Sequence, residues 1–193
     1  MTLNFEGMVS EAPHARAEQL RGLLEGLGFG DDRLSPRELE EVTRVVCARS
    51  DLFEDLVLDD GSPHWSLLLY QTAAYEIKVL AWRGDQPTDW HDHGGSSGAM
   101  SVAAGTLTER YRTTDSGNFS ARTYGPSDHG SFGPHHVHDV NFQSGPRALS
   151  IHAYSPPLSG LTHYDRTRFG FVAREFIPEG LPRETGESPT ELR

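Results

Sequence analysis

The clearest candidates for chemistry in this sequence of 193 residues are two histidines separated by one residue. His91 and His93 lie in the segment Trp-His-Asp-His-Gly-Gly. Alternate side chains of an extended strand point to the same side, so both imidazoles can reach one metal ion. A pair of surface histidines in a glycine-rich loop is the competing interpretation, and the pair taken alone favours it.

A second group of histidines follows Gly133-Pro134. It consists of His135, His136 and His138. His136 and His138 share one side of an extended segment, whereas His135 does not. The residues alone leave open which of the three could complete a metal site. Those that do not complete it are expected to be solvated or to contact a ligand from behind.

Three more polar side chains occupy alternate positions of one predicted strand. Ser150, His152 and Tyr154 therefore project from the same side of it. Such a row is ordinarily an exposed strand face. It can also be a relay in which Ser150 fixes the His152 ring and His152 orients the Tyr154 hydroxyl. A hydrolase triad of the same residue types is set aside, because no alternation of strands and helices supports the strand-to-helix elbow that positions the serine of such enzymes.

The elements that must position these residues begin with two predicted helices. An apolar stripe at helical spacing, ending in Leu24 and Leu27, predicts a helix over residues 14–28. A second helix is expected to start at Pro36, after Ser35 as N-cap, and to fade near Ser50.

Beyond the helices the hydrophobic period changes to that of strands. Short apolar or alternating runs, separated by Gly, Pro, Asp and Asn, are typical of an antiparallel β-barrel or jelly roll. The sequence therefore predicts a mainly β protein with two N-terminal helices. We expect one domain over residues 1–178, helical over 1–60 and a barrel over 62–178, followed by a flexible tail over 179–193.

Composition argues against several classes of partner. Seventeen Lys and Arg against 28 Asp and Glu give a net charge of -11, which repels nucleic-acid phosphates and anionic membranes. No segment approaches the ~18 apolar residues of a membrane span. The single cysteine, Cys47, allows no internal disulfide. We expect a cytoplasmic protein with no nucleic-acid or membrane partner; its oligomeric state stays open, a monomer included.

Longer segments around the histidines resemble a known family. The glycines that flank the first histidine pair, together with Gly133-Pro134 and His138, resemble the two metal motifs of the cupin superfamily. Residues 91–109 and the later run Ala-Leu-Ser-Ile-His-Ala-Tyr-Ser-Pro-Pro, residues 148–157, resemble bacterial cysteine dioxygenases in particular. The resemblance runs from roughly residue 75 to residue 166, includes Trp82, and implies a cupin jelly-roll barrel.

The resemblance also implies a reaction and a set of site residues. The implied enzyme is a thiol dioxygenase, which converts a small thiol and O2 to a sulfinic acid on non-heme Fe(II). The implied iron ligands are His91, His93 and His138, and the implied catalytic residues are Ser150, His152 and Tyr154. Imidazole suits zinc, copper, nickel and iron alike, so the choice of iron comes from the resemblance.

The sequence departs from the family at the substrate carboxylate. Family members bind that carboxylate with an arginine whose position maps near His64 and Trp65, and no arginine occurs between residues 50 and 82. A histidine does not replace the fork of a guanidinium. The remaining candidates are other cations, namely Arg83, Arg110, Arg112 and Arg166, and contacts from His64, Trp65, Trp82 and Trp90.

This departure leaves the substrate open between cysteine and other thiols or thiones, such as ergothioneine or 3-mercaptopropionate. A position near the second ligand that carries cysteine in some family members is Gly98 here, so a thioether with Tyr154 cannot form. A cupin that uses nickel, manganese or zinc for other chemistry, and a cupin that only binds a ligand, are the rival interpretations.

Overall fold

The computed structural model describes residues 12–30, 32–56, 64–84, 86–112, 119–168 and 170–179. These residues form α-helices, two short 3-10 helices and strands, in the order α1 (Ala12–Glu25), α2 (Pro36–Cys47), η1 (Ser50–Leu52), η2 (Glu54–Leu56), β1 (His64–Gln71), β2 (Glu76–Trp82), β3 (Trp90–His91), β4 (Ser97–Arg112), β5 (Phe119–Tyr124), β6 (His129–Phe132), β7 (His138–Ser155), β8 (Gly160–Thr167) and β9 (Gly170–Pro178).

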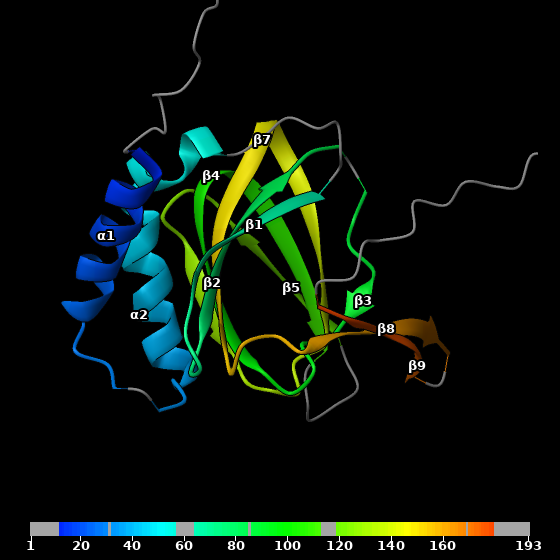
Figure 1. Cartoon of the computed structure of the whole chain (residues 1–193). Helices are drawn as coiled ribbons and strands as arrows, with labels where there is room; N and C mark the ends of the chain where they lie inside the picture. Colours follow the sequence, from blue (N-terminus) through cyan, green and yellow to red (C-terminus); the bar gives the residue numbers. More distant parts are fainter. Residues whose placement is uncertain are drawn as a thin grey trace, which may run out of the picture.

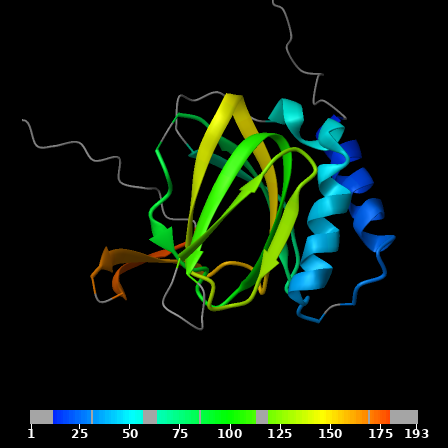
Figure 2. The same cartoon turned by 180° about the vertical axis from the view of Figure 1, so that it is seen from behind.

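The strands make one antiparallel sheet that curls into a barrel (Figure 1). β2 lies between β1 and β7, and β7 also pairs with β3 and along most of its length with β4. β5 and β6 each pair with β4. β8 pairs with β3 and β9, and the β8–β9 hairpin extends from the barrel away from the helices (Figure 2).

Both helices cover one flank of the barrel (Figures 1 and 2). α2 starts with a capping box, in which the Ser35 side chain accepts from the Glu38 N–H and the Glu38 carboxylate accepts from the Ser35 N–H. The apolar stripe of α2, formed by Leu39, Val42 and Val46, is buried against the outer face of the sheet. The residues of β2 and β7 on that face are Ile77, Val79, Leu149, Ile151 and Ala153.

The inner face of the barrel carries the other half of the same strands. Because side chains alternate along β7, the residues between those that face the helices point inward: Ala148, Ser150, His152 and Tyr154. In the register of the β2–β7 pair these four lie opposite Trp82, Leu80, Lys78 and Glu76. A second apolar cluster, which includes Trp82, Met100, Val102 and Leu107, fills part of the interior.

The predicted architecture is confirmed: the chain is mainly β and antiparallel, with two N-terminal helices. The helix expected over residues 14–28 is α1, and the one expected from Pro36 is α2. The predicted tail lies outside the described residues except for Glu179, so it stays a prediction, as does the single domain. None of the described helices has the length and apolar character that crossing a membrane requires.

Candidate metal centre and hydrogen-bonded relay

Three histidines from separate parts of the chain meet inside the barrel. His91 belongs to β3 and lies directly opposite His138, the first residue of β7, in the β3–β7 register. His93 follows in the turn between β3 and β4. One ring nitrogen from each residue lies within 4.8 Å of the others. The sequence-predicted trio is therefore brought together, although only His91 of the first pair lies in a strand.

The turn after His93 is shaped by glycine. Gly94 has φ +58°, and a Cβ there would lie 2.8 Å from the Ser159 hydroxyl and 2.9 Å from the Gly160 carbonyl oxygen. Any larger residue would push this turn away from the start of β8. Glycine at position 94 thus holds the loop close enough for the His93 ring to stay inside the barrel.

Two of the three rings are oriented by protein acceptors. His91 Nδ1 lies 2.8 Å from the Asp89 carbonyl oxygen, and His138 Nδ1 lies 2.7 Å from a carboxylate oxygen of Glu109. An N–H donated at Nδ1 leaves Nε2 with its lone pair. Each ring therefore offers Nε2 to a metal, and Glu109, His138 and the metal position form the carboxylate–histidine arrangement that tunes ligand basicity.

The three rings are neutral, as metal ligands must be. Burial, followed by the neighbouring His138 ring, lowers the pKa of His91 to about 3. The same two causes lower the pKa of His93 well below its usual value. Burial also lowers the pKa of His138, although the hydrogen bond with Glu109 opposes the shift.

The donor set fits a divalent transition metal. Nδ1 of His93 is buried and has no hydrogen-bond partner, which is unusual for a polar atom unless a ligand completes it. A second group of possible ligands, Glu109, His136 and His138, shares His138 with the first. In that group both His136 Nε2 and His138 Nδ1 already contact the same Glu109 oxygen at 2.7 Å. The trio of His91, His93 and His138 is thus the one with nitrogens left for a metal.

Glu109 is a residue that the sequence did not single out. It is buried and accepts from His136, from His138 and, at 2.9 Å, from the Tyr124 hydroxyl. Burial alone would raise the pKa of Glu109, but hydrogen bonds from His136 and His138 outweigh it and lower the pKa well below its usual range. His136 therefore contacts the carboxylate behind the His138 ring, which is one of the two places expected for it from the sequence. His135 is exposed, which is the other.

A phenylalanine separates the two histidine layers. The Phe132 ring stacks on His93 on one side, with centroids 4.7 Å apart, and on His136 on the other, also at 4.7 Å. Gly98 makes room for it, because a Cβ at this position would lie 2.4 Å from the Phe132 ring and 3.0 Å from Tyr154. Packing at Gly98 thus sets the position of His93.

The predicted row on β7 is a hydrogen-bonded relay inside the barrel. Ser150 Oγ lies 2.9 Å from His152 Nε2, and His152 Nδ1 lies 3.2 Å from the Tyr154 hydroxyl. The Tyr154 ring is 5.1 Å from the His93 ring, so the relay reaches the histidine trio. Trp82 extends it at the other end, since its Nε1–H donates to Ser150 Oγ at 2.8 Å.

The direction of the relay follows from its donors. Burial lowers the pKa of His152 to about 3, so its ring is neutral and carries one N–H. With Trp82 donating to Ser150, the Ser150 hydroxyl can donate to His152 Nε2, and His152 Nδ1–H then donates to Tyr154. Burial also raises the pKa of Tyr154 well above its usual value. Tyr154 accordingly keeps its own O–H as a donor toward the interior.

The four predicted substrate contacts lie in different places. His64 is opposite Trp82 in the β1–β2 register, and the two rings are 5.3 Å apart. Trp65 is on the other face of β1 and packs against the core beneath the helices. Trp90 packs against Phe119 and Phe171, with ring centroids 5.4 Å and 4.8 Å away. Only His64 and Trp82 thus belong to the surroundings of the relay.

The four arginines proposed as substitutes for the family arginine are also distributed. Arg110 pairs with Asp139 and lies over the Trp90 ring. Arg166 lies over Phe119, at 4.1 Å from its centroid. Arg112 lines a cavity of about 480 Å³ that also reaches Glu109 and Phe132, whereas none of His91, His93, His152 and Tyr154 lines it. Arg83 comes directly after β2.

The inner row of β2 holds a cation that is not among the four arginines expected from the sequence. Lys78 lies opposite His152 in the β2–β7 register and is buried. The signal was present, since Lys78 is the only lysine in the sequence and interrupts an apolar strand. The resemblance to the family points to an arginine at the substrate carboxylate, and therefore does not single out this lysine.

The chain was compared with protein families, with curated protein sequences and with solved structures. A comparison with curated protein sequences found no match. Solved structures similar to the chain include KdgF from Halomonas sp. (16% identity, TM-score 0.44, 51% of this chain and 84% of that chain). A cupin superfamily protein from Desulfitobacterium hafniense has 12% identity and TM-score 0.44, over 53% of this chain and 86% of its own. A Klebsiella pneumoniae protein with a double-stranded beta-helix domain has 13% identity and TM-score 0.49, over 57% and 86%.

The family match covers the elements that build the site. The model of the family described as cysteine dioxygenase type I matches residues 38–167, which span from α2 to the end of β8 and include the trio and the relay. This match extends over more than half of the chain. The chain therefore belongs to the cysteine dioxygenase type I family.

Proposed function

We propose that the chain is an Fe(II)-dependent thiol dioxygenase, which adds both atoms of O2 to the sulfur of a small thiol and yields a sulfinate. The observation that carries this proposal is the contact between the histidine trio and the hydrogen-bonded relay. The trio of His91, His93 and His138 offers neutral nitrogens to one metal, and the Tyr154 end of the relay lies against the His93 ring. Membership of the cysteine dioxygenase type I family supports the same reaction class.

The proposed roles follow from the environment of each residue. Ferrous iron, when bound, supplies the chemistry of dioxygen and holds the thiolate sulfur. Because three neutral imidazoles add no negative charge, the bound metal would keep its charge of +2 and attract anionic ligands such as a thiolate. Glu109 keeps the His138 ring turned with Nε2 inward, and the Asp89 carbonyl does the same for His91. Tyr154 is held by the hydrogen-bonded chain of Trp82, Ser150 and His152. Its hydroxyl can donate a hydrogen bond to the substrate or to oxygen.

The direct test is oxygen uptake by protein loaded with ferrous iron, with mass spectrometry of the product. We expect a sulfinate that carries two oxygen atoms from labelled O2, with iron required and zinc inactive. The thiols to compare are L-cysteine, 3-mercaptopropionate and ergothioneine, because the family's carboxylate-binding arginine is missing. A stable, iron-loaded protein that oxidises none of them would overturn the proposal.

Two variants separate the metal from the relay. His91→Ala is expected to lose both iron and turnover, and a protein that retained both would contradict the ligand assignment. Tyr154→Phe removes the relay hydroxyl while the ring still packs on His93, so iron binding is expected to remain while kcat falls. A cytoplasmic location is part of the proposal, in keeping with the single cysteine of the sequence.

A further inference from the structure

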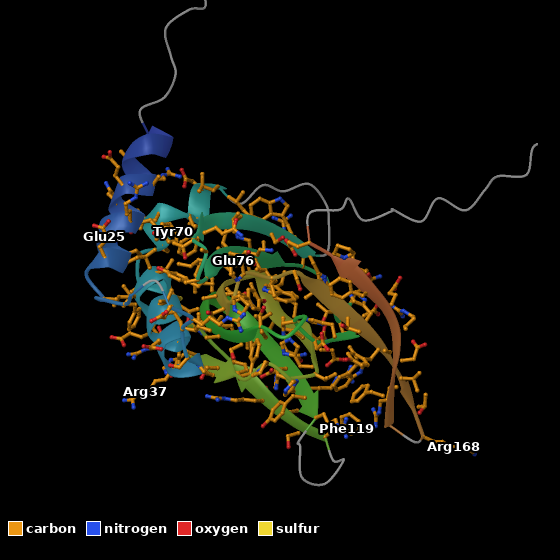
Figure 3. All side chains as sticks on the ribbon, turned by 60° about the horizontal axis from the view of Figure 1, so that its bottom comes forward. Glu25, Arg37, Tyr70, Glu76, Phe119 and Arg168 are labelled. Atoms are coloured by element: carbon orange, nitrogen blue, oxygen red, sulfur yellow. The ribbon has the colours of Figure 1, made fainter. Side chains whose placement is uncertain are left out.

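The inner face of β2 carries a pair of opposite charges beside the relay. Glu76 lies opposite Tyr154 and Lys78 lies opposite His152 in the β2–β7 register. Glu76 is 2% exposed and Lys78 is 8% exposed. The Lys78 ammonium is 3.4 Å from Glu76 Oε1 and also pairs with Glu179, just after β9. Figure 3 places Glu76 toward the middle of the molecule, between the helices and the β8–β9 hairpin.

Burying an ammonium among apolar side chains is costly unless it is paired. Lys78 is the only lysine of the sequence, and among the described residues it is the one lysine or arginine that is buried. The apolar neighbours of Lys78 on the strand, Ile77 and Val79, face the helices. A leucine or methionine at position 78 would fill the interior at less cost. The charge itself therefore needs an explanation.

The two carboxylates that pair with Lys78 differ in how they are held. Glu76 is buried, and its Oε1 has the ion pair with Lys78 at 3.4 Å but no hydrogen-bond partner. The Glu179 side chain is 43% exposed. Its backbone is fixed, because the Glu179 N–H donates to the Ser159 carbonyl, but its carboxylate can exchange the ammonium for water. An incoming anion could thus replace Glu179 on Lys78, whereas it could not replace Glu76.

We propose that Lys78 binds the carboxylate of an acidic thiol, and that this carboxylate takes the place of Glu179. The proposal rests on the proposed function, since the thiol sulfur would lie at the histidine trio, but it concerns the opposite end of the substrate. Lys78 supplies the cation that the first strand lacks. Glu76 holds the ammonium in the interior, and Glu179 occupies it when no substrate is bound.

The charges of the cluster make a selective prediction. With Glu179 displaced, Lys78, Glu76 and a substrate carboxylate carry the same total charge as the cluster with Glu179 in place. A neutral thiol leaves Glu179 where it is and gains nothing from Lys78. An aminothiol such as cysteamine would instead be drawn to Glu76, and preference for cysteamine over 3-mercaptopropionate would overturn the proposal.

Because the chain has one lysine, its side chain can be observed directly. Protein labelled with 13C at lysine Cε gives a single lysine methylene signal. The protein is loaded with zinc, which binds imidazole and thiolate but has no redox chemistry. We expect 3-mercaptopropionate to shift this signal to saturation, and the isosteric neutral thiol 3-mercaptopropionamide to leave it close to its starting position. Equal shifts with both thiols, or none, would overturn the proposal.

Variants measured by calorimetry on the same zinc-loaded protein give the second test. Glu179→Gln removes the competing carboxylate at an exposed position, so 3-mercaptopropionate should bind severalfold more tightly while the amide is unaffected. Lys78→Met should weaken the acid by roughly tenfold or more, as expected for a lost charged hydrogen bond, and leave the amide unchanged. The double variant Glu76→Gln with Lys78→Met removes both buried charges and serves if the single variant does not fold.

The outcomes distinguish this inference from the dioxygenase function. If 3-mercaptopropionate moves the lysine signal but iron-loaded protein consumes no oxygen, the anion site stands and the proposed reaction fails. If iron-loaded protein oxidises thiols while Glu179→Gln and Lys78→Met change acid and amide alike, the reaction stands and Lys78 has only a structural role. An unchanged preference for the acid in Lys78→Met would likewise overturn the inference.

Discussion

At the scale of single residues, the carboxylate of Glu109 links two layers of histidine. It contacts His138, whose other ring nitrogen is left for a metal, and His136, which stacks on Phe132. A buried anion of this kind stabilises a positive charge on the ring or metal it faces. Glu109 therefore belongs to the metal centre although it is not a member of the trio.

Substitution of Glu109 by glutamine is expected to weaken metal binding. Glutamine has the same length and one acceptor oxygen, but it lacks the charge and places an NH2 group near a donor. Loss of such a partner typically lowers metal affinity about 10–100-fold. Competition with a chelator measures the affinity, and Glu175→Gln at an exposed position is the matched control. A Glu109→Gln protein that binds metal as tightly as the parent would contradict this role.

The buried His152 ring predicts how the stability of the metal-free protein depends on pH. Its pKa is lowered to about 3 in the folded state from the usual 6.5, so between these values the unfolded chain binds more protons. Stability is therefore lost as the pH falls below 6.5. A complete difference in protonation is worth about 1.4 kcal/mol per pH unit.

The measurement is the free energy of unfolding in urea at pH 7 and pH 5, with metal removed. His152→Gln should lose less stability between the two pH values than the parent, because one of the groups that take up a proton on unfolding is gone. His91, His93 and His138 also take up protons on unfolding in both proteins, and burial remains the main cause of their lowered pKa values in the variant. An identical loss in parent and variant would show that His152 is not held neutral by burial.

At the scale of elements, the close approach of β4, β6 and β7 fixes the site. Gly98 of β4 pairs with Phe132 of β6 on one side and with Tyr154 of β7 on the other. Both rings lean over the glycine, and both also contact His93. The strand pairing thus positions the ligand ring through side chains that belong to neither β3 nor the turn after it.

Gly98→Ala is expected to destabilise the fold and to disturb the trio. The added Cβ would lie 2.4 Å from the Phe132 ring, which cannot move freely because it is stacked between His93 and His136. Overpacking of this kind costs about 1–3 kcal/mol. Urea unfolding measures the loss, and Gly133→Ala, where the Cβ meets nothing within 4 Å, is the control. Equal stability of the two variants would contradict the tight packing.

At the scale of the whole molecule, the described residues form two apolar cores on opposite faces of one sheet. The outer core lies between the helices and β2, β4 and β7, and the inner core lies within the barrel around the relay. A hydrogen bond from Ser101 of β4 to Thr43 of α2 connects the sheet with the helix layer at 2.9 Å. The helices therefore support the site without contributing a residue to it.

Leu39→Ala in α2 is expected to lower global stability and to leave the metal centre intact. Leu39 is fully buried in the outer core, and truncation of a buried leucine costs about 2–5 kcal/mol. The metal affinity of the folded fraction should be unchanged, because no contact of the trio is altered. Thermal unfolding and chelator competition measure the two effects. A large change in metal affinity would mean that the helix layer and the barrel interior are coupled.

The sequence by itself determined the features that depend on local spacing. The capping box at Ser35 and the apolar stripe of α2 were readable because a helix start is set by neighbouring residues. Ser150, His152 and Tyr154 were readable as a row because a strand alternates with period two. The histidine trio came from the resemblance to the family, since residue spacing alone left the third ligand open.

The tertiary structure decided which distant side chains share the interior. The β1–β2 register puts His64 opposite Trp82, and therefore turns its neighbour Trp65 toward the helices. Glu109 reaches His138 over 29 residues, and Glu179 reaches Lys78 over 101. Pairing across such separations depends on how the barrel closes, and no local pattern encodes it. Burial inside the closed barrel then lowers the pKa of His138, because water no longer solvates the charged form of its ring.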